Sequence, residues 1–131
     1  MDNFKNRKAT KGLKVFVYYN LHKGLWSIKA TEGEHKGKVV AHCEQVGLMD
    51  AKPKVSEKGR QRVLEEKQKN VHAGIAGTIL WIDGATVDTS RAKQVSYNPY
   101  KKPHFVYKGD LTEFTGCDYA ILKDKSVWEI V

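Results

Sequence analysis

Residues 96–108, SYNPYKKPHFVYK, interleave aromatic side chains with cations. Aromatic faces stack on nucleobases at roughly 1–3 kcal/mol per base, while cations hold phosphate groups. The pattern therefore predicts contact with a nucleotide or a single nucleic-acid strand. The alternative interpretation is that the rings form the core of a short hairpin and the lysines are its solvated flanks. The candidate ligand-binding residues are Tyr97, Asn98, Tyr100, Lys101 and Lys102, with Trp26 as a further candidate for stacking.

A second group of candidates lies in GRQRVLEEKQKNVHAG, residues 59–74. The guanidinium forks of Arg60 and Arg62 are suited to binding a phosphate, and Asn70 adds a polar amide near the far end. A helix would spread these residues over many ångströms, so they would share one small site only if the chain folds back. For Arg62 the alternative is a helix-surface pair with Glu66.

Two histidines could carry a reaction. His42 and His72, brought together with Arg60, could cleave a phosphodiester without a metal ion. One imidazole would remove a proton and the other would donate one, while the arginine would stabilise the developing charge. The alternative for His72 is a half-buried histidine that only packs. We expect no metal and no cofactor, because no carboxylate and histidine group has ligand spacing and no phosphate-binding glycine loop is present.

Short extended segments surround these candidates. KVFVYYN, residues 14–20, and LWSIKA, residues 25–30, flank turn-forming residues and predict a β-hairpin. VVAHCEQVGLMD, residues 39–50, predicts one further strand, which Pro53 ends. Other strands are expected at residues 75–82 and in DYAILKD and SVWEIV near the C-terminus.

A helix is predicted over residues 56–69, with Ser56 as its N-cap and a narrow apolar stripe that includes Val63 and Leu64. The expected fold class is α+β, with a curved, mainly antiparallel β-sheet of about six to eight strands packed on this one central helix. Residues 1–12 are predicted to be a basic flexible arm, and residues 13–131 a single α+β domain.

Charge and cysteine usage limit the partners and the compartment. The chain has 131 residues with 23 Lys+Arg against 15 Asp+Glu, a net charge of +8 that favours an anionic partner, or else only aids solubility. Two widely separated cysteines indicate a reducing compartment. The sequence shows no signal peptide and no apolar run of membrane-spanning length, so we expect a cytoplasmic protein without a membrane partner. A homo-oligomer could build a pocket between chains.

Several motifs together resemble a family of small proteins encoded by tailed bacteriophages, for which no activity is established. They are VYYNLHKGLWSIKA, GKVVAH, KVSEKGRQRVLEEKQKNVHAGIAGT and YNPY followed by FV. The resemblance covers most of residues 13–106 and stops before the tail from Lys108. It implies a setting rather than a mechanism: the cytoplasm of an infected bacterium, where small phage proteins often bind or destroy host components, including the nucleotide signals of antiviral defence.

Three functions are compatible with these residues. The leading hypothesis is a phage accessory protein that binds an anionic, nucleotide-like ligand, either nucleic acid or a signalling nucleotide. The second is a metal-independent phosphodiesterase or nuclease that uses His42 and His72 with Arg60. The third is a protein–protein inhibitor of a host enzyme. Whether the protein is an enzyme is left open by the sequence.

Overall fold

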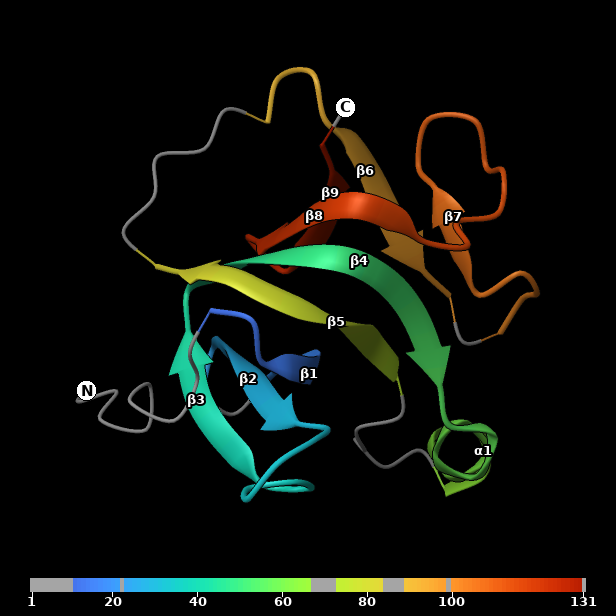
Figure 1. Ribbon diagram of the computed structural model, residues 1–131. Coiled ribbons are helices and arrows are strands. Elements are labelled where there is room, and N and C mark those ends of the chain that lie inside the picture. The colour runs from blue at the N-terminus through green and yellow to red at the C-terminus, as the bar shows by residue number, and fades with distance from the viewer. Residues whose placement is uncertain (1–10, 22, 67–72, 84–88, 99, 131) are drawn as a thin grey trace.

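The structure is a computed structural model that describes residues 11–21, 23–66, 73–83, 89–98 and 100–130. Within these ranges the chain forms a nine-stranded sheet and one helix (Figure 1). The elements are β1 (Lys14–Asn20), β2 (Leu25–Ala30), β3 (Val39–Cys43), β4 (Gln45–Val55), α1 (Glu57–Glu66), β5 (Ala73–Ile82), β6 (Lys93–Tyr97), β7 (Phe105–Tyr107), β8 (Cys117–Lys123) and β9 (Ser126–Glu129). No helix in these ranges is long and apolar enough to span a membrane.

The strands pair in the order β3-β2-β1-β5-β4-β8-β9-β6-β7, and every pair is antiparallel. Figure 1 shows β4 and β5 crossing the middle of the molecule, with β1 to β3 on one side and β6 to β9 on the other. The predicted hairpin is confirmed: β1 pairs with β2, and Tyr19 lies opposite Trp26. This central position of β4 and β5 lets the two halves of the sheet share one core.

The core forms because alternate residues of the strands point to the same face. In β1, Val15 and Val17 are buried while Lys14 is exposed. The sheet curls, since Trp26 from β2 and Phe105 from β7 come from near its opposite ends, yet both belong to the same buried cluster. A sheet that curls in this way covers its own apolar face and needs no helix layer.

The predicted sheet packed on a central helix is therefore wrong. The helix α1 is ten residues long, follows β4 and lies beside the end of that strand rather than across the sheet (Figure 1). Its first turn is polar and Leu64 is only half-buried, so it lacks the wide apolar stripe that a covering helix needs. Ser56 does act as the N-cap, because its Oγ accepts a hydrogen bond from the Gly59 N–H at 3.3 Å. Residues 67–69 of the predicted helix lie outside the described residues.

The single strand predicted over residues 39–50 is also wrong. It divides into β3 and β4 at Glu44, where Oδ1 of Asp83 accepts hydrogen bonds from the N–H groups of Glu44 at 2.9 Å and Gln45 at 3.0 Å. Pro53 does not end β4, which continues to Val55. Beyond Ala51, β4 has no paired residue on its β8 side, so a proline without an N–H is tolerated there.

Gly47 is a position where the sheet has no room for a side chain. It pairs with Trp81 of β5, whose indole covers it and donates a hydrogen bond to Oη of Tyr119 at 2.8 Å. A Cβ at Gly47 would lie 2.5 Å from Cε2 of that indole and closer still to Nε1. We expect Gly47→Ala to lower the free energy of unfolding by about 1–3 kcal/mol, the usual effect of overpacking.

A matched control is Gly109→Ala, because nothing lies within 4 Å of a Cβ built there. Urea denaturation of both variants measures the difference. Equal midpoints for the two variants would show that the Trp81 indole can move aside without cost.

Candidate functional site

Both halves of the curled sheet contribute to one cavity of about 320 Å³, which we call the aromatic cavity. Its walls come from β1 and β2 on one side, from β6, β7 and β9 on the other, and from the start of β5. The lining residues are Tyr18, Tyr19, Trp26, Ala73, Gly74, Ile75, Val95, Ser96, Tyr97, Phe105, Lys125 and Val127. Five of these twelve described residues are aromatic, and Lys125, in the turn between β8 and β9, supplies a cation.

Ring contacts hold the cavity walls in place. Tyr19 and Trp26 meet edge to face, with centroids 5.2 Å apart and planes at 80°. On the other side of the cavity, the centroid of the Tyr97 ring lies 4.8 Å from that of the Phe105 ring. The Nζ of Lys125 lies 5.9 Å from the centroid of the Tyr19 ring, within cation–π range. The cavity therefore combines fixed aromatic surfaces with a positive charge.

Trp26 contributes its ring to this wall rather than its N–H group. The side chain is 5% exposed, and its Nε1 is buried with no hydrogen-bond partner in the part of the chain that the structure describes. A buried donor without a partner costs about 1–3 kcal/mol. Replacing Trp26 would change packing and polarity together, so the tyrosines are better probes of stacking.

A second cluster lies next to the aromatic cavity, at the start of α1, and we call it the Glu57 cluster. One carboxylate oxygen of Glu57 accepts hydrogen bonds from Nη2 of Arg60 at 2.8 Å and from its Nε at 3.1 Å. The other oxygen lies 3.9 Å from Nε2 of His104. The hydrogen bond from Arg60 is the main reason why the pKa of Glu57 is lowered, and the charges of Arg60, Lys102 and His104 act in the same direction.

Tyr97 connects the aromatic cavity to the Glu57 cluster. Its ring lines the cavity, and its centroid lies 6.1 Å from that of the His104 ring. Burial raises the pKa of Tyr97 to about 12, while the charge of Arg60 lowers that pKa and the charge of Glu57 raises it. The phenol is therefore within the electrostatic reach of both members of the ion pair.

Asn98 forms hydrogen bonds within the loop that follows β6. The N–H of Asn98 donates to the carbonyl of His104 at 2.8 Å, and its side-chain Oδ1 accepts from the N–H of Tyr100 at 2.8 Å. Nδ1 of His104 lies 2.9 Å from the Asn98 carbonyl oxygen, which can only accept, so that nitrogen carries a proton. Asn98 thus serves to shape the loop.

The structure brings together some of the predicted site residues and separates others. Trp26 and Tyr97 line the same cavity, and Arg60 lies close to Tyr97. Tyr100 and Lys101 are exposed and do not line the aromatic cavity, while Lys102, also exposed, acts on Glu57. Asn70 and His72 lie outside the described residues, and so does the side chain of Arg62. Their roles stay predictions.

The predicted catalytic His42 lies on β3 and is 6% exposed. Its Nδ1 is 3.0 Å from Oγ of Ser27, the residue opposite it on β2, and that oxygen also accepts a hydrogen bond from Nδ2 of Asn20 at 3.3 Å. These contacts hold His42 in a buried polar group of the sheet. His72 is outside the described ranges, so its pairing with His42 stays a prediction.

Several residues of the site were not predicted from the sequence as ligand-binding residues. Among them are Tyr19 and Lys125 of the aromatic cavity and Glu57 and His104 of the Glu57 cluster. The hairpin pattern could have revealed Tyr19, because a turn over residues 21–24 places it opposite Trp26. The i,i+3 spacing of Glu57 and Arg60 could have revealed their ion pair. Local sequence carries no signal for the contact of His104 with Glu57 or for that of Lys125 with Tyr19, since these residues are far apart along the chain.

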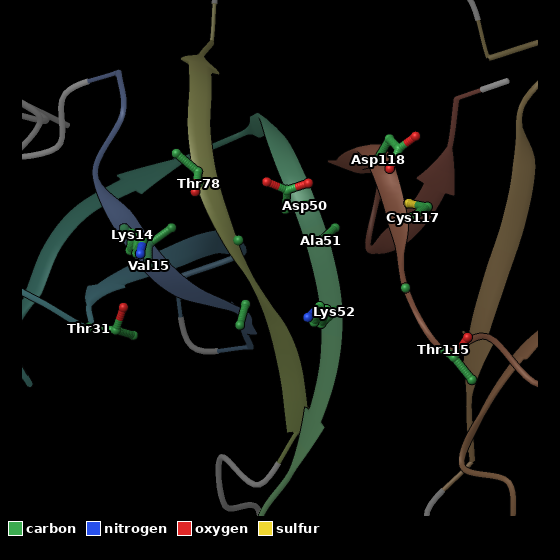
Figure 2. A pocket seen from close by; sticks show the side chains of 13 residues that line it. Lys14, Val15, Thr31, Asp50, Ala51, Lys52, Thr78, Thr115, Cys117 and Asp118 are labelled. Atoms are coloured by element: carbon green, nitrogen blue, oxygen red, sulfur yellow. The ribbon is translucent and has the colours of Figure 1, made fainter.

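A larger concavity of about 580 Å³ crosses the sheet from β1 to β8. Figure 2 shows Lys14 and Thr31 at one side, Thr115 and Asp118 at the other, and Asp50 with Lys52 between them. Among the residues that the structure describes, none of the predicted site residues lines this groove and none of the lining side chains is aromatic. Its two lysines are offset by two aspartates, so it is less suited to an anionic ring ligand than the aromatic cavity.

Fold and site together define a small, curled, antiparallel β-protein with an aromatic cavity. The chain belongs to the bacteriophage family described as Mycobacterium phage L5 gene 82 protein, whose family model matches residues 8–130. Over 123 residues it is 37% identical to the Gene 82 protein of Mycobacterium phage L5, which covers 89% of this chain and 95% of that protein. No solved structure matches the chain. The resemblance to phage proteins is confirmed, and it extends past Lys108, where the quoted motifs stop.

Proposed function

We propose that this phage protein binds a nucleotide-like ligand whose flat ring enters the aromatic cavity. The observation that carries the proposal is the convergence of Tyr19, Trp26 and Tyr97 on one cavity that also contains Lys125. Bases stack on such rings whatever their sequence, because every base has a π-face. The net charge of +8 would steer an anion toward the protein.

The size of the cavity favours a small ligand over a polymer. Ligand pockets typically enclose about 300–1,000 Å³, and this cavity of about 320 Å³ is at the lower limit. One base with its sugar suits that space better than several stacked bases. In an infected bacterium, a protein that captures small nucleotides would reduce the level of a nucleotide signal, including one used in antiviral defence.

The test is a calorimetric titration at low salt with mononucleotides, cyclic nucleotides, single-stranded DNA and RNA. We expect a mononucleotide or cyclic nucleotide to bind, with an affinity that changes only slightly with salt because one or two phosphates are contacted. A polymer that contacts many phosphates would instead give a steep dependence of affinity on salt. The absence of any affinity at low salt would contradict the proposal. A steep dependence of affinity on salt would show that the ligand is a nucleic acid and not a small nucleotide.

A further inference from the structure

The side chains of Arg60 and His104 both face the carboxylate of Glu57. The Arg60 side chain is 14% exposed and that of His104 is 10% exposed, whereas the Glu57 side chain between them is 55% exposed. The Arg60 and His104 side chains are therefore fixed in the protein, while the Glu57 carboxylate, which Arg60 binds, can turn out into water. This asymmetry indicates a site for an anion that the protein's own carboxylate occupies.

The His104 ring supplies an independent observation. Its Nδ1 donates to the Asn98 carbonyl, which fixes the ring, and its Nε2 is buried without a hydrogen-bond partner among the described residues. This nitrogen lies 3.9 Å from the nearer oxygen of Glu57, which is too far for a hydrogen bond. A proton on Nε2 makes this nitrogen a donor. A phosphate has more oxygens than a carboxylate and can reach both this donor and the Arg60 fork.

The position relative to the aromatic cavity completes the argument. The Tyr97 ring lines the cavity, its centroid lies 6.1 Å from that of the His104 ring, and the charge of Arg60 acts on its phenol. The start of α1, a ten-residue helix, also favours negative charge at this point. We propose that Arg60 and His104 are the phosphate subsite of the ligand, and that Glu57 occupies this subsite until the ligand's phosphate displaces it. This inference rests on the proposed function and assigns its anion-binding part.

The test compares ribonucleoside 5′-monophosphates with the matched nucleosides, because their affinity ratio reports the phosphate subsite alone. Glu57→Gln removes the competing carboxylate, and we expect it to raise the ratio roughly twofold to fivefold, the strength of an exposed ion pair. Arg60→Gln removes the fork, and we expect it to lower the ratio about tenfold. Glu65→Gln is the matched control, since it removes the same charge from an exposed position on the same helix.

The outcomes separate this inference from the proposed function. If the wild-type protein binds nucleotides and nucleosides equally well, the subsite is wrong while the role of the cavity stands. If Glu65→Gln raises the ratio as much as Glu57→Gln, the effect is one of net charge and the subsite is again wrong. If neither class of compound binds, the proposed function fails together with the subsite.

Discussion

Replacing Phe114 by alanine is expected to lower the free energy of unfolding by about 3–5 kcal/mol, the usual cost of deleting a buried phenylalanine side chain. Phe114 is 1% exposed and is the largest of the fully buried side chains in the described part of the protein. Its ring meets that of Tyr107 edge to face at 5.6 Å, and its N–H donates to the Phe105 carbonyl at 2.9 Å. Alanine would leave a void between β7 and the core.

The matched control is Leu111→Ala in the same connection between β7 and β8. Leu111 is 71% exposed, so its truncation should change stability by less than about 0.5 kcal/mol. Urea unfolding followed by tryptophan fluorescence measures both variants. If the two variants unfold at the same urea concentration, Phe114 does not hold this segment to the core.

Tyr97→Leu is expected to weaken nucleotide binding about fivefold or more, since stacking on an aromatic ring contributes roughly 1–3 kcal/mol per base. Leucine preserves most of the apolar contact with Phe105 but removes the flat surface that lines the aromatic cavity. The variant is first shown to be folded. Calorimetric titration with a mononucleotide that the wild-type protein binds then gives its dissociation constant.

Tyr100→Leu provides the comparison that locates the ligand. It makes the same chemical change three residues further along the chain, but Tyr100 is 78% exposed and lies outside the lining of the cavity. We expect its affinity to match that of the wild-type protein. A loss of affinity in Tyr100→Leu as large as that in Tyr97→Leu would place the ligand on the exposed loop instead of in the cavity.

The strands could be predicted from the sequence where local pattern determines them. The hairpin of β1 and β2 has β-branched and aromatic strands around a turn, and the structure has the same boundaries. The layer arrangement could not be predicted in this way. The helix pattern suggested a helix that covers the sheet. Whether the sheet needs such a helix depends on whether it curls on itself, which is a property of all nine strands together.

The candidate site shows the same division. Aromatic and cationic residues in the segment around Tyr97 pointed to ring binding, yet only Tyr97 from that segment's candidates lines the cavity. Tyr97 is the last residue of β6 and lines the cavity, whereas Tyr100 lies in the loop that follows and is exposed. The partners of Tyr97 across the cavity, Tyr19 and Trp26, are far away in sequence and become neighbours only through the strand order.

The placement of the cavity between β1 and β2 on one side and β6 and β7 on the other has a consequence for folding. These walls are separated by most of the chain, so the pocket exists only after every intervening strand has paired, and contacts of such long range form slowly. A ring bound in the cavity would contact β1 and β2 on one side and β6 and β7 on the other. Ligand binding would then stabilise the whole domain in proportion to the logarithm of ligand concentration, and molecules that had not finished folding would be unable to compete for the nucleotide.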